Sequence, residues 1–287
     1  MRINTNVASL NAQESAVNTN NNLSSSLEKL SSGLRINKAS DDASGLAIAD
    51  KLRTQASSIA QSISNGNSAV SLTQIADKAM AEQSNILDIV KQKLIQASTA
   101  TTSQEGRTAI AKDINKLLTQ LDNIASQTNY NGIALLQESA TGTASSNEAT
   151  FQMGEKAANT ISLASGIQSN TSGLEGMATL TTETSGTNAD DFSAAEARSY
   201  MVKVDSALNQ LNGWRSDVGS TQNQLESALR NMMTQQTNIK AAESVIRDVD
   251  YAAESANFNK QNIIAQAGTY AQSQSNAIQQ NVLRLLQ

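Results

Sequence analysis

The chain has 287 residues, a formal net charge of −5, and no histidine, cysteine or proline. Without histidine and cysteine it lacks the commonest metal ligands, the usual proton shuttle at neutral pH, thiol nucleophiles and disulfides. An acidic balance without a basic run disfavours nucleic-acid binding, and aromatic residues make up only 3%, too few for a base-stacking platform. Because an average chain has about 5% proline, its absence predicts long uninterrupted helices.

Apolar spacing predicts a first helix over residues 1–35, with a stop signal at Gly33 and Asn37. A second, longer helical pattern follows Ser40 and continues to residue 97. After a break at residues 101–103, a third pattern over 110–124 has strict heptad spacing. The apolar stripe of the first helix comprises Ile3, Val7, Leu10, Leu23, Leu27, Leu30 and Leu34.

The adjacent acids Asp41 and Asp42 lie between the first two helical patterns. A calcium loop of the EF-hand type is excluded because the alternating acids, the central glycine and the closing glutamate are missing. We expect Ser40 or Asp41 to accept hydrogen bonds from the first amides of the helix that begins at Ala43. Asp42 is then expected in its first turn, where the helix dipole favours negative charge.

The middle of the chain is rich in glycine, serine and threonine. Residues 150–154 and 159–163 read as two short strands of a hairpin, and residues 165–191 as a surface loop with little periodicity.

Helical periodicity returns in the C-terminal part, with a heptad frame over 204–239 and a final helix predicted over 246–287. The final stripe includes Ile263, Ile278, Val282, Leu285 and Leu286. The expected fold is mainly α: a long antiparallel helical bundle or coiled coil formed by both chain ends, with a small β-hairpin region at the far tip.

Nothing in the sequence indicates an enzyme or a cofactor. There is no Gly-x-Ser-x-Gly motif, no histidine to act as a base, and no glycine-rich phosphate loop. Trp214 is expected to pack against a neighbouring helix. Residues 1–13 include no apolar segment typical of a cleaved secretory signal, and no apolar run approaches the ~20 residues that span a bilayer.

The two terminal helices each have a narrow apolar stripe, and pairing with each other would bury only one face. Such a pair gains too little burial to offset its ordering entropy. We therefore expect both ends to be loose in the free monomer and to become ordered when subunits stack. The low charge content of 16% leaves two interpretations open: a low-charge soluble bundle, or helix faces that meet other subunits of a polymer.

Several segments closely resemble the conserved regions of bacterial flagellins. At the N-terminal end these are MRINTNVASLNAQ, LSSGLRINKASDDASGLAIADKLR and LTQLDNIASQTNYNGIALL. At the C-terminal end they are VGSTQNQLESALRN, AAESVIRDVDYAAES and QQNVLRLLQ. FQMG and NTISL are similar to the β-hairpin of that family. The resemblance covers the chain outside roughly 165–191 and suggests a short form like the flagellins of the Campylobacter and Helicobacter group.

The resemblance implies a secreted structural subunit of the extracellular flagellar filament, exported unfolded through the flagellar type III apparatus and polymerised at the distal tip. Residues 1–40 and 246–287 would form the inner tube, residues 41–164 and 192–245 a wall domain with its hairpin near 149–164, and residues 165–191 a short variable surface loop. The implied partners are other copies of the chain, an export chaperone at the C-terminal helices, and the cap and hook-junction proteins, with no nucleic acid and no membrane insertion. A hook–filament junction protein of the same superfamily is the alternative.

Two further expectations follow from the resemblance. The segment that matches the receptor-binding motif of many flagellins lacks its two arginines and its acid, which predicts weak activation of the flagellin-sensing Toll-like receptor. Its residues are Leu87, Ile89, Lys91, Gln92 and Leu94. Hydroxyl residues of the predicted surface loop either carry O-linked sugars or are unmodified, and the intact mass would decide between these alternatives. They are Ser165, Ser169, Thr171, Ser172, Thr181, Thr182, Thr184 and Ser185.

Overall fold

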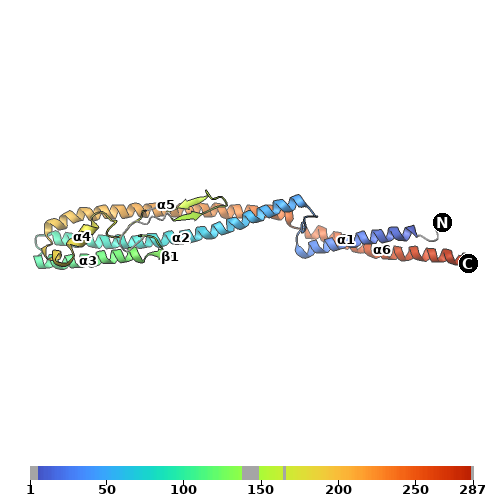
Figure 1. Ribbon diagram of the computed structural model, residues 1–287, viewed down its shortest axis with the longest axis horizontal. Helices are drawn as coiled ribbons and strands as arrows, with labels where there is room; N and C mark the ends of the chain where they lie inside the picture. Colours follow the sequence, from blue (N-terminus) through green and yellow to red (C-terminus); the bar gives the residue numbers. More distant parts are fainter. Residues whose placement is uncertain (1–5, 138–148, 164–165, 286–287) are drawn as a thin grey trace. The chain divides into compact units, whose positions relative to one another are not determined.

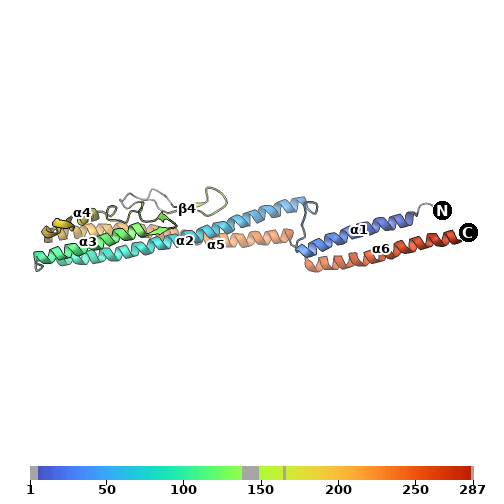
Figure 2. The same cartoon turned by 60° about the horizontal axis from the view of Figure 1, so that its bottom comes forward.

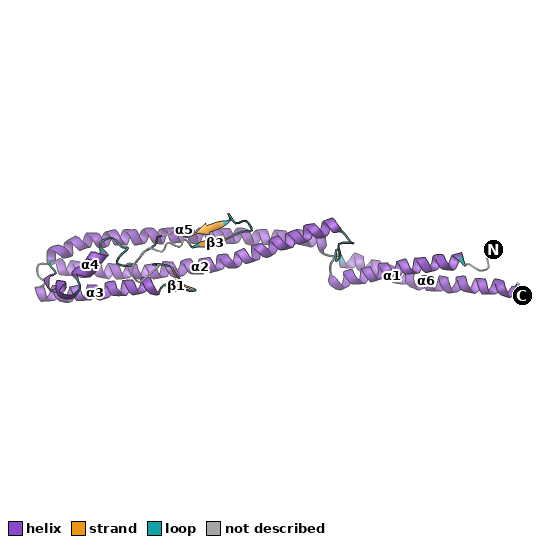
Figure 3. Cartoon of the chain, viewed as in Figure 1, coloured by secondary structure: helices purple, strands orange, loops and turns teal. Residues whose placement is uncertain are grey.

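A computed structural model describes residues 6–137, 149–163 and 166–285 of the chain (Figure 1). Helices dominate these residues, and the strands are short (Figure 3). The helices are α1 (Val7–Ser32), α2 (Ala43–Ser98), α3 (Gln104–Gln127), α4 (Met177–Glu183), the 3-10 helix η1 (Gly186–Asp191), α5 (Ala194–Arg247) and α6 (Tyr251–Leu285). The strands are β1 (Asn129–Tyr130), β2 (Ile133–Ala134), β3 (Thr150–Gln152) and β4 (Thr160–Ser162). The mainly helical fold with a small hairpin is confirmed.

The chain divides into two compact units. Unit 1 contains Met1–Ser57 and Gln236–Gln287, and unit 2 contains Ser58–Gln235. Both divisions fall inside long helices, α2 and α5. Within the described residues, no helix is long and apolar enough to cross a membrane.

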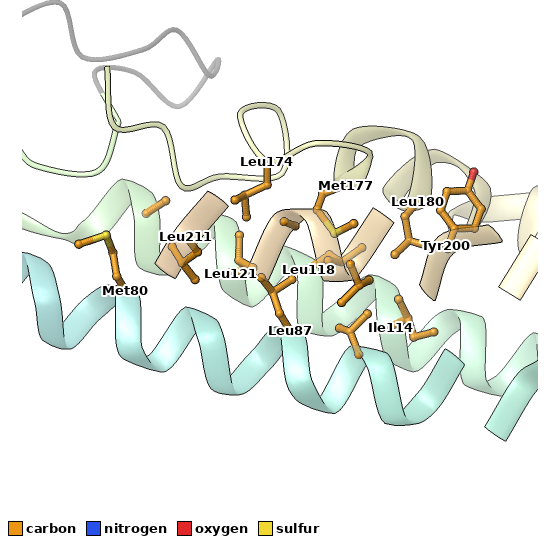
Figure 4. Packing of buried hydrophobic residues seen from close by; sticks show 14 of the residues in the cluster. Met80, Leu87, Ile114, Leu118, Leu121, Leu174, Met177, Leu180, Tyr200 and Leu211 are labelled. Carbon is orange, nitrogen blue, oxygen red and sulfur yellow. The ribbon is translucent and has the colours of Figure 1, made fainter. Parts of the chain in front are cut away.

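Unit 2 has an apolar core built from α2, α3, α5 and the segment that leads to α5 (Figure 4). On α2 the buried positions alternate by three and four residues, as in a coiled-coil seam. From residue 76 to the end of α2 they are Ala76, Met80, Gln83, Leu87, Val90, Leu94 and Ala97. The predicted seam of α3 is wider than expected, because Leu118 and Ala125 are fully buried beside the half-buried Leu117 and Ile124. Trp214 packs against this core, as expected.

The boundaries of these helices follow from capping residues. Ser103 ends the predicted break after α2, and its side-chain oxygen accepts a hydrogen bond from the amide of Gly106 at 3.2 Å. Ser193 and Glu196 form a reciprocal capping box before α5, with the Ser193 amide 2.8 Å from the Glu196 carboxylate and the Glu196 amide 3.2 Å from Ser193 Oγ. Both starts are therefore encoded locally.

The structure differs from the surface loop expected over residues 165–191. The described part of this segment contains α4 and η1, and Ile167, Leu174, Met177 and Leu180 are buried in the core of unit 2. Leu174, Met177 and Leu180 recur every third residue, which favours one shared buried face. Threonine, serine and glycine between them obscure this short periodicity.

The predicted hairpin is present, with β3 antiparallel to β4 and Phe151 opposite Ile161. Its position differs from the expected far tip. Asn65 Nδ2 lies 3.4 Å from the Gln152 carbonyl, and Gly66 abuts Met153, so the hairpin lies near the start of unit 2 on α2. The α2–α3 turn is at the other end of that helix. A second hairpin, β1–β2, turns at Asn131 and Gly132, which both have positive φ, as two-residue hairpin turns require.

In unit 1, α1 and α6 lie side by side as an antiparallel pair (Figures 1 and 2). The contact between Asn6 and Ser275 and that between Ser26 and Glu254 define this pairing. The predicted final helix over 246–287 is divided differently in the structure. The end of α5 reaches Arg247, residues 248–250 are not helical, and α6 begins at Tyr251.

Candidate functional site: the terminal helices and their joint

Small side chains form the seam between α1 and α6. On each helix, a series of less exposed positions alternates by three and four residues, the spacing of a coiled-coil seam. On α1 they are Ser9, Ala12, Ala16, Thr19, Leu23, Ser26 and Leu30. On α6 they are Glu254, Phe258, Gln261, Ala265, Gly268, Gln272 and Ser275. Most of these side chains are small or polar, so the pair buries little apolar surface.

Polar contacts fix the register of this pair. The buried Ser26 hydroxyl donates to the Glu254 carboxylate, and Asn257 Nδ2 lies 3.4 Å from Ser26 Oγ. Toward the other end, Asn6 Nδ2 donates to the Ser275 carbonyl at 3.2 Å. A polar group at a seam position favours one register over others, because a slip would leave it unpaired.

Larger apolar side chains point away from the seam. Val7 and Leu10 are 57% and 54% exposed, Leu27 is 52% exposed, and Ile263 and Ile278 are 67% and 56% exposed. The only buried residues of α1 are Thr19 and Ser26, and the described side chains of α6 include no buried one. Within its described part, the terminal helical pair therefore has no apolar core of its own.

The predicted assembly stripe thus divides between two surfaces. Leu23 and Leu30 are half-buried in the seam, and Leu34 is half-buried in the joint after α1. Ile3 and Leu286 lie outside the described residues, and Val282 and Leu285 belong to α6 but their side chains are outside the described part. The sequence pattern did not separate seam positions from outward positions, because both faces repeat at nearly the same period.

Gly33 ends α1 as predicted. It has φ +72°, a left-handed conformation, and its amide donates to the Lys29 carbonyl at 2.9 Å. Asn37 stabilises the turn, since its side-chain amide donates to Ser32 Oγ at 2.8 Å and to the Leu34 carbonyl at 3.1 Å. Residues 33–42, which we call the joint, therefore have a defined conformation.

The two acids of the joint have other functions than those expected of them. Asp42, not Ser40 or Asp41, caps α2 by accepting the Gly45 amide at 2.9 Å. Asp41 closes the loop instead, because its Oδ2 accepts the amides of Asn37 and Lys38, both at 3.0 Å. Ser40 is exposed in the turn. The expected start of α2 at Ala43 is confirmed, but the residue directly before that start is Asp42, so assigning the cap to Ser40 or Asp41 was wrong; Asp41 is left free to bond backward.

Electrostatics agree with these contacts. The Lys38 and Asn37 amides hold the pKa of the Asp41 carboxyl below its ordinary value. A hydrogen bond and charge attraction from Glu28 raise the pKa of Lys38, whose ammonium lies 2.6 Å from the Glu28 carboxylate. Among the described residues, no group of three or more acidic, histidine or cysteine side chains could hold a metal ion.

Replacing Gly33 by valine is expected to impair polymerisation and swimming more than export. A β-branched residue in the left-handed region costs about 1–2 kcal/mol or more, although space for a Cβ is open at Gly33. Swimming assays and secreted protein levels measure the two effects separately. Gly33→Asn is the matched control, because asparagine tolerates this conformation and should keep motility. Unchanged motility in the valine variant would count against the joint.

The segment matched to the receptor motif has a buried and an exposed side. Leu87 and Leu94 are fully buried in unit 2, whereas Ile89 and Gln92 are exposed. Lys91 is half-buried and forms an ion pair of 2.5 Å with Asp205 on α5. Only Ile89, Lys91 and Gln92 are thus accessible to a partner in the single chain.

The candidate glycosylation residues also divide by burial. Ser169, Thr171 and Thr184 are buried, and Thr171 donates to the Asp122 carboxylate at 2.8 Å. Thr181 is half-buried, and Ser165 lies outside the described residues. The buried hydroxyls are inaccessible in the folded chain, so these three were poor candidates; their burial follows from the unpredicted packing of residues 166–191. The exposed ones are Ser172, Thr182 and Ser185.

The fold is mainly helical, and the two chain ends pair with each other in one unit. Family models of the bacterial flagellin N-terminal and C-terminal helical regions match residues 3–141 and 201–286. The chain belongs to the bacterial flagellin family, whose members are structural subunits of the flagellar filament.

Individual relatives agree with this assignment. Flagellin from Bacillus subtilis is 36% identical, and the alignment covers 100% of both chains. Flagellin B from Helicobacter pylori (strain J99) is 43% identical over 74% of this chain but only 39% of that longer protein. The structure of a putative flagellar hook-associated protein from Vibrio parahaemolyticus matches with a TM-score of 0.59 and 13% identity, over 72% of this chain and 99% of that one. At that identity the last match shows a shared fold alone.

Proposed function

We propose that the chain polymerises into the filament through the outward faces of α1 and α6, and that neighbouring subunits complete the fold of this helical pair. Two features of the same helical pair carry the proposal: its seam consists mostly of small side chains, and its large apolar side chains are exposed on the outward faces. The exposed side chains are Val7, Leu10, Leu27, Ile263 and Ile278. Fully burying one Leu, Ile or Val side chain contributes about 1.5–3 kcal/mol. Contacts with other copies would supply this burial several times per subunit.

The free monomer should hold these helices loosely. Ordering a residue costs about 1–2 kcal/mol of backbone entropy, and the 26 residues of α1 and 35 of α6 gain little from their seam. Unit 2 differs, because its core is complete within residues 58–235. The monomer would then combine a folded unit 2 with ends that become ordered on assembly.

Family membership supports the finer features of the proposal. Residues 1–40 and 246–287 would line the inner tube, and residues 41–164 and 192–245 would form the wall. Of residues 165–191, the exposed side chains such as Ser172, Thr182 and Ser185 would face outward. The chain would be exported unfolded by the flagellar type III apparatus, with a chaperone on its C-terminal helices, and added at the distal tip beneath the cap protein. Hook-junction proteins would be its neighbours at the base of the extracellular filament.

Seeded elongation tests the proposal. Purified monomer is added to short filament fragments, and the products are viewed by electron microscopy. Long filaments are expected. Short oligomers without elongation would favour the alternative, a hook–filament junction protein. Amide exchange on the same samples should show α1 and α6 weakly protected in the monomer and strongly protected in filaments. Full protection in the monomer would contradict assembly-coupled ordering.

We also propose that the chain activates the flagellin-sensing Toll-like receptor weakly. Ile89 and Lys91 stand where many flagellins have arginines, and Gln92 stands where they have an acid. Losing two guanidinium groups removes planar, bidentate hydrogen bonding that lysine and isoleucine do not replace. A reporter-cell assay is expected to show poor potency that improves in the triple variant I89R/K91R/Q92E. Nanomolar potency of the unmodified chain would overturn this proposal.

A further inference from the structure

The break between α5 and α6 is not explained by the residues that form it. Residues 244–260 contain neither glycine nor proline, and their apolar spacing predicts one helix through the break. Nevertheless α5 ends at Arg247 and α6 begins at Tyr251. Helix breaks of this kind have an identifiable cause, such as a foreign group inserted into the hydrogen-bond ladder.

The joint supplies that foreign group. The Arg35 amide donates to the Arg247 carbonyl at 2.6 Å, and the Arg35 guanidinium donates to the Ile246 carbonyl at 2.7 Å. The Val249 amide donates to the Gly33 carbonyl at 3.0 Å. In a continuous helix the same groups would bond to partners four residues away in their own segment. The last carbonyls of α5 are therefore capped by a residue more than 200 positions earlier.

Local residues permit the break but do not require it. Asp250 accepts the amides of Ala252 and Ala253 at 3.0 and 3.1 Å, so it can start α6. Asp248 accepts the Ser244 hydroxyl at 2.5 Å. Neither contact involves the carbonyls of Ile246 and Arg247, which only the joint engages across the break. The local contacts can therefore start α6 at Asp250, but they leave the Ile246 and Arg247 carbonyls to the joint.

We infer that residues 33–35 act as a long-range cap within the chain that ends α5 and redirects the chain into α6, with Arg35 as the positioning residue. Without this cap, helix continues through residues 248–250. The C-terminal helix consequently takes its place against α1 only once the joint has formed. The order in which the C-terminal helix docks on α1 affects filament assembly, and this part of the inference rests on the proposed function. The cap itself is a property of the single chain.

A disulfide reports on the cap directly, because the natural chain has no cysteine. Leu34 and Asp248 form an isolated antiparallel bridge, and the two backbone hydrogen bonds flank them rather than join them. Cα atoms of such a pair lie about 4.5 Å apart, within the range of disulfides. The double variant L34C/D248C in the full chain is expected to form an intramolecular disulfide under mild oxidation. The control L34C/V245C places its second cysteine on α5 at a position that is 81% exposed.

Arg35→Ala in the L34C/D248C background is expected to slow disulfide formation by about tenfold, because it removes a charged hydrogen bond to the end of α5. Arg35→Lys should restore part of the rate. Lys240→Ala is the control, because Lys240 is an exposed cation on α5 in the same unit, and it should leave the rate unchanged. Arg53 is unsuitable, since its partner Asp50 also pairs with Arg247 at 3.9 Å. Trp214 fluorescence verifies that unit 2 remains folded in every variant.

Each result decides between the alternatives. A disulfide in L34C/D248C that forms no faster than in L34C/V245C overturns the proposed long-range cap. An equal rate after Arg35→Ala and Lys240→Ala removes Arg35 as the positioning residue. A wild-type chain that fails to elongate on seeds, while the disulfide still forms, contradicts the proposed function and leaves the cap intact.

Discussion

Replacing Leu87 by alanine is expected to lower the free energy of unfolding of unit 2 by about 2–5 kcal/mol. Leu87 is fully buried in α2 and packs in the cluster that α3 and α5 complete (Figure 4). Removing its side chain loses transfer free energy and leaves a cavity in long, closely packed helices, which cannot easily collapse. Urea unfolding followed by the fluorescence of Trp214, the single tryptophan, measures the effect inside unit 2.

Ile89→Ala is the matched control for this prediction. Ile89 lies two residues further along the same helix but is 42% exposed, so its truncation should cost about 1 kcal/mol or less. The pair also separates stability from recognition in the receptor-like segment, because Leu87 and Leu94 cannot contact a partner without unfolding. Equal destabilisation by both variants would show that the packing of α2 differs from the structure.

The long helices were predictable because their signals are local and repeated. The heptads of α2, α3 and α5 recur over many turns, and the break at residues 101–103 has a serine cap at Ser103. Gly33 was predictable for the same reason, since a left-handed helix end favours glycine. These features depend on neighbours within four residues.

The features that sequence reasoning missed depend on distant residues or on very short elements. Arg35 ends α5 from the other end of the chain, so no pattern near residue 247 signals it. The α4 turn has only seven residues, too few for periodicity to stand out from its threonines. The β1–β2 hairpin has two residues per strand, although its Asn131-Gly132 turn is a known hairpin signal.

The candidate assembly surface was predicted as one stripe, whereas the structure separates two surfaces with different chemistry. The seam between α1 and α6 is polar or small, as at Thr19 and Ser26, and defines register. The outward surface carries Leu10 and Ile263 and supplies apolar area. A register set by polar contacts and an affinity set by apolar ones can be changed independently by mutation.

Ile263→Asp is therefore expected to block filament elongation while leaving unit 2 intact. Ile263 is 67% exposed in the chain, and its loss removes about 1.5–3 kcal/mol of burial at each subunit contact. A buried aspartate without a partner adds a desolvation cost. Since about 1.4 kcal/mol corresponds to a tenfold change in equilibrium constant, the critical concentration should rise at least tenfold. Light scattering on seeds at graded monomer concentrations measures it.

Ile263→Leu is the matched control, because it keeps apolar volume and should elongate nearly as the wild type does. Asp and Ile have similar helix propensities, so a difference between the aspartate variant and the wild type reports on the environment of the side chain rather than on α6 itself. The urea midpoint from Trp214 should be the same in all three chains, since Ile263 belongs to unit 1. Elongation of the aspartate variant at the wild-type critical concentration would mean that position 263 stays in water in the polymer. The apolar face of α6 would then require another function.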